Sequence, residues 1–112
     1  MSEYNQATQD RIQNATGQHE LWVMLATANN SPASLDKIAF QGPCYVYQKD
    51  SHWGNGESYL SEKLNDPTWL DLCVSANTML HYIEDQDHIY LEGAEVFDEH
   101  EGEKYIKLRM GS

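Results

Sequence analysis

The chain has 112 residues, 40% of them hydrophobic and 11% aromatic, and its 18 acidic and 7 basic side chains give a net charge of −11. This length predicts a single domain, residues 1–112, with one modest core. No apolar run reaches the roughly 18–20 residues of a membrane-spanning helix, so no membrane partner is predicted. The acidic excess argues against direct nucleic-acid binding, because phosphate contacts need clustered Lys and Arg.

The ends of the chain and its cysteines indicate a soluble, cytoplasmic protein. The first ten residues are polar and lack the basic and apolar segments of a secretory signal. Two cysteines, Cys44 and Cys73, are too few for the disulfide framework of a small secreted domain, so free thiols are predicted. Residues 1–17 are predicted to be a frayed end or a short surface helix. The terminal residues 111–112 are interpreted as a cloning scar.

Short apolar segments fill the first half of the chain. The continuous run at residues 21–28 has the length of a buried strand and the composition of a buried helix, and we favour the strand. Two further apolar pieces, 38–40 and 44–47, flank a Gly-Pro pair that indicates a turn or an edge bend. Residues 58–64 are predicted to form a short helix that stops before Pro67.

The clearest predicted element is a helix over about residues 67–83. Asp66 is a suitable N-cap, and Pro67 fits the first helical position. Apolar residues then recur at steps of three and four, which places them on one helix face: Trp69, Leu72, Cys73, Ala76, Leu80 and Ile83. A stripe of this width fits across a sheet.

The last quarter predicts a β-hairpin over about residues 88–110, with an acidic turn in which Gly102 supplies a left-handed residue. The second strand alternates, with inward Ile106, Leu108 and Met110. A bulge at Gly93 would let the first strand turn all its apolar residues inward: Ile89, Leu91, Ala94 and Val96. Glu92 and Glu95 would then face Lys107 and Arg109.

These elements predict an α+β fold. It contains a small antiparallel sheet of about four strands, one main helix (about 67–83) packed across it, and the C-terminal hairpin (about 88–110).

Acidic residues concentrate in the hairpin. Nine acids and no Lys or Arg lie between Glu84 and Glu103. They are either a solvated surface or a face that binds a basic protein, and a weaker alternative is a DNA mimic that inhibits a nucleic-acid-binding protein. The candidate residues of this acidic face are Glu92, Glu95, Asp98, Glu99, Glu101 and Glu103.

Two other groups of residues could carry chemistry. Residues 81–88 combine imidazoles and carboxylates but match no metal-binding motif, so no metal or other cofactor is predicted. The weak metal candidates are His81, Glu84, Asp87 and His88. Tyr45 and Tyr47 share one face of a strand, and Trp53 lies in a Gly-rich loop suited to a contact surface. The candidate aromatic and pocket residues are Trp53, Tyr45, Tyr47, Trp69 and His81.

The sequence contains no phosphate-binding loop, dinucleotide motif or nucleophile elbow, so no catalytic residue is predicted and an enzyme is disfavoured. We expect a module that binds a protein partner through its acidic hairpin or an exposed aromatic loop. Open sheet edges favour a homodimer. The alternative is a small-molecule-binding domain or small enzyme with a pocket between helix and sheet.

Overall fold

The computed structural model describes residues 6–17, 20–25, 34–49 and 57–111. Its radius of gyration is 13.1 Å, which agrees with the value of about 13 Å expected for a compact chain of this length. The elements in chain order are α1 (Gln6–Thr16), β1 (Met24–Leu25), η1 (Ser34–Asp36), β2 (Pro43–Gln48), β3 (Tyr59–Leu60), β4 (Leu64–Asn65), α2 (Trp69–Ile83), β5 (Tyr90–His100) and β6 (Glu103–Gly111).

The α+β class is confirmed, but the sheet is mixed and has six strands, not four antiparallel ones. The strands lie in the order β1-β5-β6-β2-β3, with β4 also paired to β2. β5 and β6 are antiparallel, whereas β1 runs parallel to β5 and β2 runs parallel to β6. The hairpin thus inserts between two earlier strands. Such long-range pairing sets strand direction independently of the local pattern.

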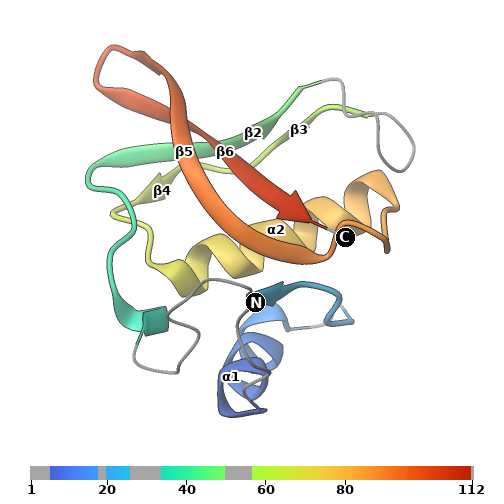
Figure 1. The fold of residues 1–112 in the computed structure, drawn as a ribbon. Coiled ribbons are helices and arrows are strands. Elements are labelled where there is room, and N and C mark those ends of the chain that lie inside the picture. Colours follow the sequence, from blue (N-terminus) through green and yellow to red (C-terminus); the bar gives the residue numbers. More distant parts are fainter. Residues whose placement is uncertain (1–5, 18–19, 26–33, 50–56, 112) are drawn as a thin grey trace.

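The molecule is layered, with the sheet on one side, α2 beneath it and α1 beneath α2 (Figure 1). Both helices therefore lie on the same side of the sheet. The predicted apolar stripe of α2 is confirmed, because its members after Trp69 are all fully buried. Ile12, the large aliphatic residue of α1, is also fully buried and joins the same core.

Helix α2 begins two residues later than predicted, and its N-cap is Thr68. The Thr68 hydroxyl accepts a hydrogen bond from the Asp71 amide at 3.2 Å, and the Asp71 carboxylate accepts one from the Thr68 amide at 2.9 Å. Asp66, the predicted cap, instead adopts a left-handed φ of 47° and accepts a hydrogen bond from the Gly42 amide at 2.6 Å. Asp66 therefore stabilises the turn before β2.

Of two other local predictions, one is wrong and one is confirmed within the described residues. The short helix at 58–64 is wrong: β3 and β4 form there, because both pair with β2. In the apolar run 21–28, residues 24–25 form a strand as favoured, and residues 26–28 lie outside the described residues.

A buried amide accounts for the non-strand backbone before β1. Asn77 lies in the middle of α2 and is fully buried. Its side-chain oxygen accepts hydrogen bonds from the Trp22 and Val23 amides at 2.7 and 3.1 Å, and its nitrogen donates to the Glu20 carbonyl at 3.0 Å. These three bonds replace the ladder bonds of a strand and attach residues 20–23 to α2.

The hairpin and its first bulge are confirmed. The turn is the pair Glu101-Gly102, both with positive φ (52° and 80°), as a two-residue hairpin turn requires. The pairing register shifts between Leu91 and Gly93, where the bulge was predicted. Gly111, interpreted above as part of a scar, pairs with Tyr90 inside β6.

A second, unpredicted register shift lies between Val96 and Asp98. Contrary to prediction, Val96 is 39% exposed, because this end of the hairpin extends beyond α2 (Figure 1). Glu95 lies opposite Lys107 as predicted, but Glu92 lies beside Gly111 and not beside Arg109. Arg109 instead covers Gly93, where an added Cβ would come within 2.4 Å of the guanidinium.

Candidate functional site

The face of the sheet opposite α2 carries no helix of the described residues (Figure 1). Strand alternation directs Cys44 and Val46 of β2 into the core, so Tyr45 and Tyr47 point to this outer side. On β6, Tyr105 pairs with Tyr45 and therefore shares that side. We call the four rings Tyr45, Tyr47, Phe97 and Tyr105 the aromatic face.

The rings of the aromatic face contact one another. Tyr45 stacks on Tyr105 with ring centroids 5.3 Å apart, and Tyr47 stacks on Phe97 at 5.8 Å. Tyr105 lies edge-on to both Tyr47 and Phe97, at 6.5 Å in each case. Contacts across three strands make one continuous cluster, which holds the rings in place.

The aromatic face is partly exposed and is hollowed on one side. Phe97 is 47% exposed, and the neighbouring Leu60, which pairs with Tyr47, is 55% exposed. A cavity of about 260 Å³ opens on the same side. It is lined by Tyr47, Gln48, Lys49, Phe97 and Lys107.

Two of the four rings of this face were predicted from the sequence. Tyr45 and Tyr47 were candidates, whereas Phe97 and Tyr105 were not. Tyr105 could have been assigned, because it alternates with the inward Ile106. Phe97 could not have been assigned to this face from the sequence, because its position depends on the second register shift in β5.

The candidate acids do not form one face. In the hairpin register, Glu95, Asp98 and Glu103 lie on the outer side with the aromatic face, and Glu99 lies on the opposite side. Glu101 is in the turn, and Glu92 is at the first bulge. Glu103 pairs with Lys63 at 2.6 Å, and this hydrogen bond raises the pKa of Lys63.

Some of these acids also protect an open edge. From Gly93 to His100, β5 pairs only with β6 among the described residues. Bulges and charges on such an edge discourage pairing with another strand, and β5 carries two bulges together with Glu95, Asp98 and Glu99. Asp98 contacts His100 at 2.8 Å, and this bond lowers the pKa of Asp98.

The weak metal candidates are not brought together. Among the residues that the structure describes, no three His, Cys, Asp or Glu side chains form a group suited to a metal ion. The His81 ring stacks on Trp22 at 3.7 Å, with Nε2 2.7 Å from the Glu20 carbonyl oxygen. Glu84 is the left-handed C-cap of α2, and Asp87 is exposed in the following turn.

Asp85, which was not a candidate, is the organising residue of that turn and is only 4% exposed. Its carboxylate accepts hydrogen bonds from the Asp87 and His88 amides at 2.7 and 3.1 Å and contacts the His88 ring at 2.9 Å. Burial acts to raise the pKa of Asp85, but these bonds outweigh burial and leave the pKa lowered.

The remaining candidates give no site. Trp69 is half-buried against the core at the start of α2. Trp53 lies outside the described residues. Cys44 and Cys73 are free and buried, and burial raises the pKa of Cys73 to about 12, which makes this thiol a poor nucleophile.

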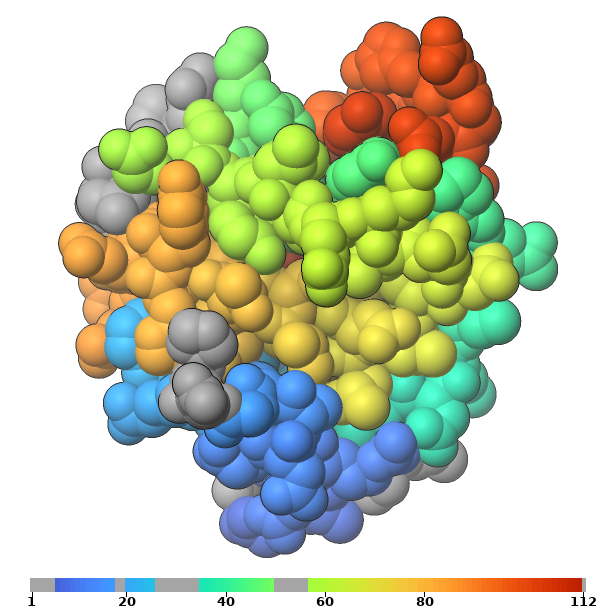
Figure 2. Space-filling model, turned by 180° about the vertical axis from the view of Figure 1, so that it is seen from behind, coloured from blue at the N-terminus to red at the C-terminus, as the bar shows by residue number. Residues whose placement is uncertain are grey.

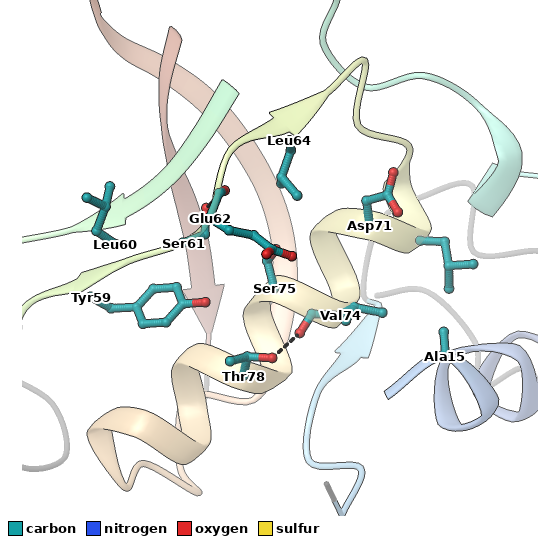
Figure 3. Close-up of a pocket in the computed structure, with 11 residues that line it drawn as sticks. Ala15, Tyr59, Leu60, Ser61, Glu62, Leu64, Asp71, Val74, Ser75 and Thr78 are labelled. Carbon is teal, nitrogen blue, oxygen red and sulfur yellow. Dashed lines mark hydrogen bonds between the residues drawn. The ribbon is translucent and has the colours of Figure 1, made fainter. Parts of the chain in front are cut away.

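A second cavity, of about 470 Å³, lies between α2, α1 and the β3–β4 segment (Figure 3). Like the expected pocket, it lies between a helix and strands of the sheet. It opens on the flank of α2, and the candidate residue His81 does not line it. Its lining residues are Ala15, Tyr59, Leu60, Ser61, Glu62, Leu64, Leu70, Asp71, Val74, Ser75 and Thr78.

Comparison with protein-family models, curated proteins and solved structures finds no match. Within the described residues, no helix has the length and apolar character needed to cross a membrane.

Proposed function

We propose that this protein is an interaction module that binds a basic partner protein on its aromatic face. The observation that carries the proposal is the cluster of four rings on a sheet face that no helix of the described residues covers. A sheet face that is open to solvent is ordinarily polar. A partly exposed group of contacting aromatic side chains is typical of the centre of a protein interface.

The cavity beside Phe97 supplies a place for an anchor. Interface energy concentrates in a few aromatic or Arg side chains that fill pockets near the centre of the contact. The 260 Å³ cavity between Tyr47 and Phe97 has the size for one large side chain of a partner. The already stacked rings would lose little conformational entropy on binding.

The negative charge of the protein favours a basic partner. The net charge of −11 attracts basic proteins and repels a second copy of this chain. On the outer side, Asp98 and Glu103 lie toward the hairpin tip, whereas Lys107 and Arg109 lie toward the other end of β6. The partner therefore presents an apolar or aromatic side chain with Lys or Arg on the side nearest the hairpin tip.

Selection from a phage-displayed library of random peptides tests this proposal. Enriched peptides should combine an aromatic or aliphatic residue with Lys or Arg, and their affinity should fall as salt is added. Phe97→Ser should weaken a selected peptide at least roughly tenfold, the loss expected at an interface hot spot. The matched control is Ile38→Ser, because Ile38 is 55% exposed but lies outside the aromatic face.

Two outcomes would contradict the proposal. One is that selected peptides lack basic residues or bind the Phe97→Ser variant as well as the wild type. The other is a concentration-dependent dimer in sedimentation velocity that Phe97→Ser abolishes, which would assign the face to a second copy.

A further inference from the structure

The cavity on the flank of α2 has the features of a separate ligand site, and it does not depend on the proposed partner surface. Seen from behind, α2 crosses the molecule between α1 and the segment of residues 57–65 (Figure 2). The cavity lies in this region, on the helical side of the sheet, whereas the aromatic face is on the other side. We call it the flank pocket.

Two largely buried residues line the flank pocket with hydroxyl groups that make no hydrogen bond to any other described residue. Tyr59 is 9% exposed and Ser75 is 7% exposed. Figure 3 shows the Tyr59 hydroxyl directed from β3 toward α2, where Ser75 and Thr78 lie. The Thr78 hydroxyl is already engaged, because it donates to the Val74 carbonyl at 3.1 Å. The Tyr59 and Ser75 hydroxyls line the cavity and are therefore positioned to bond to an occupant.

The charged residues that line the pocket are both acids, Glu62 and Asp71. The Asp71 carboxylate is held by the Thr68 amide in the capping box. The Glu62 carboxylate makes no hydrogen bond within the described residues, and Figure 3 shows it pointing into the pocket. Burial raises the pKa of Tyr59, and the negative charge of Glu62 raises it further.

The apolar part of the lining complements the polar part. Leu64, Leu70 and Val74 provide aliphatic surface beside the carboxylate and the hydroxyls. A ligand with a charged head and an aliphatic stem would match both parts. The volume of about 470 Å³ is within the range of small-molecule sites.

We propose that the flank pocket binds an organic cation, an ammonium or guanidinium group on an aliphatic stem. Glu62 forms the ion pair with the head group, and the hydroxyl oxygens of Tyr59 and Ser75 accept its remaining N–H groups. The Tyr59 ring adds a cation–π contact. The stem lies along Leu70 and Val74.

A free amine or guanidine and the Arg or Lys side chain of a protein share this chemistry. Titration of the full-length ¹⁵N-labelled chain, followed by NMR, separates the two sources. One arm uses agmatine and 1,4-diaminobutane, and the other uses blocked arginine amide and short Arg-containing peptides. Saturable shifts of the Tyr59, Ser61 and Ser75 amides support the proposal in either arm, and the tighter-binding arm identifies the source.

Charge and hydroxyl variants make the test specific. Glu62→Gln should weaken agmatine binding at least roughly tenfold, because it removes the charge-assisted bonds. Tyr59→Phe, which keeps the ring and removes the hydroxyl, should weaken it several-fold. Glu99→Gln is the matched control, because it removes the same charge from the exposed hairpin and should leave affinity unchanged.

Three results would overturn the proposal. The first is no shift at the lining amides with any of the cations at millimolar concentration. The second is equal binding of butan-1-ol and agmatine, which would show an apolar site that ignores charge. The third is an equal effect of Glu62→Gln and Glu99→Gln, which would show only nonspecific attraction to an acidic protein. Because the aromatic face is on the other side of the sheet, none of these results bears on the proposed partner surface.

Discussion

The two faces of the sheet differ in the kind of side chain they carry. Along β2, Cys44 and Val46 are fully buried under α2, whereas Tyr45 and Tyr47 alternate with them and are half-buried on the outer side. β6 repeats the pattern, with Ile106 facing α2 and Tyr105 facing outward. Aliphatic and thiol side chains fill the space where α2 covers the sheet, and stacked rings occupy the side on which the described residues place no helix. This difference is the basis of the proposal that the outer face contacts a partner, while the inner face stabilises the fold.

Ile106→Ala is the variant with the largest expected loss of stability. Ile106 is fully buried, so the substitution removes apolar contacts and leaves a cavity. We expect the free energy of unfolding to fall by about 3 kcal/mol, measured by urea denaturation. A decrease in the free energy of unfolding below about 1 kcal/mol would contradict the assignment of the inner face as the stabilising core.

Asn77→Ala tests the buried polar bonds on the helical side. It leaves the Trp22 and Val23 amides without their acceptor, and we expect a loss of about 2–3 kcal/mol. Thr78→Ala is a suitable control, because the Thr78 hydroxyl bonds only to the carbonyl of its own helix. Equal losses in the two variants would show that Asn77 does not hold residues 20–23 to α2.

Asp85 gives the helical side a pH dependence. Its pKa lies below the ordinary value of 3.8, so its stabilising contribution is present above that value and is lost as the pH falls through the folded-state pKa. Asp85→Ala should cost about 2 kcal/mol at neutral pH. Asp85→Asn keeps an acceptor oxygen without the charge, and its stability should fall less than that of the wild type below pH 3.8. Parallel decreases in urea denaturation of the wild type and Asp85→Asn would contradict this assignment.

Phe97→Ser should have the smallest effect on stability. Phe97 is 47% exposed, so we expect a change of at most about 1 kcal/mol while peptide binding is lost. A loss as large as that of Ile106→Ala would make the aromatic face a second core and not a binding surface.

Elements with a local signal could be predicted, and those fixed by long-range contacts could not. The α2 stripe, the hairpin and the bulge at Gly93 each follow from spacing within one segment. The parallel pairing of β2 with β6 depends on where the hairpin inserts, and residues 59–60 and 64–65 form strands because both pairs of residues bond to β2. Asp is a preferred residue type at a helix N-cap, but the Asp66 carboxylate accepts a hydrogen bond from the Gly42 amide and does not cap α2.

The same limit applies to the candidate sites. The shared strand face of Tyr45 and Tyr47 followed from alternation alone. Phe97 joined them only through a register shift that no local pattern indicated. The flank pocket combines Tyr59 of β3, Glu62 of the β3–β4 connection and Ser75 of α2, and no pattern within one segment indicates that they meet.

We propose that the aromatic face is the surface that binds a partner. The most direct test is an NMR titration of the ¹⁵N-labelled chain with a basic, aromatic peptide selected on the wild type. We predict amide shifts confined to β2, β5 and β6, reduced by salt and lost in Phe97→Ser. Shifts centred on α1 and α2, or binding that Phe97→Ser leaves intact, would contradict the claim.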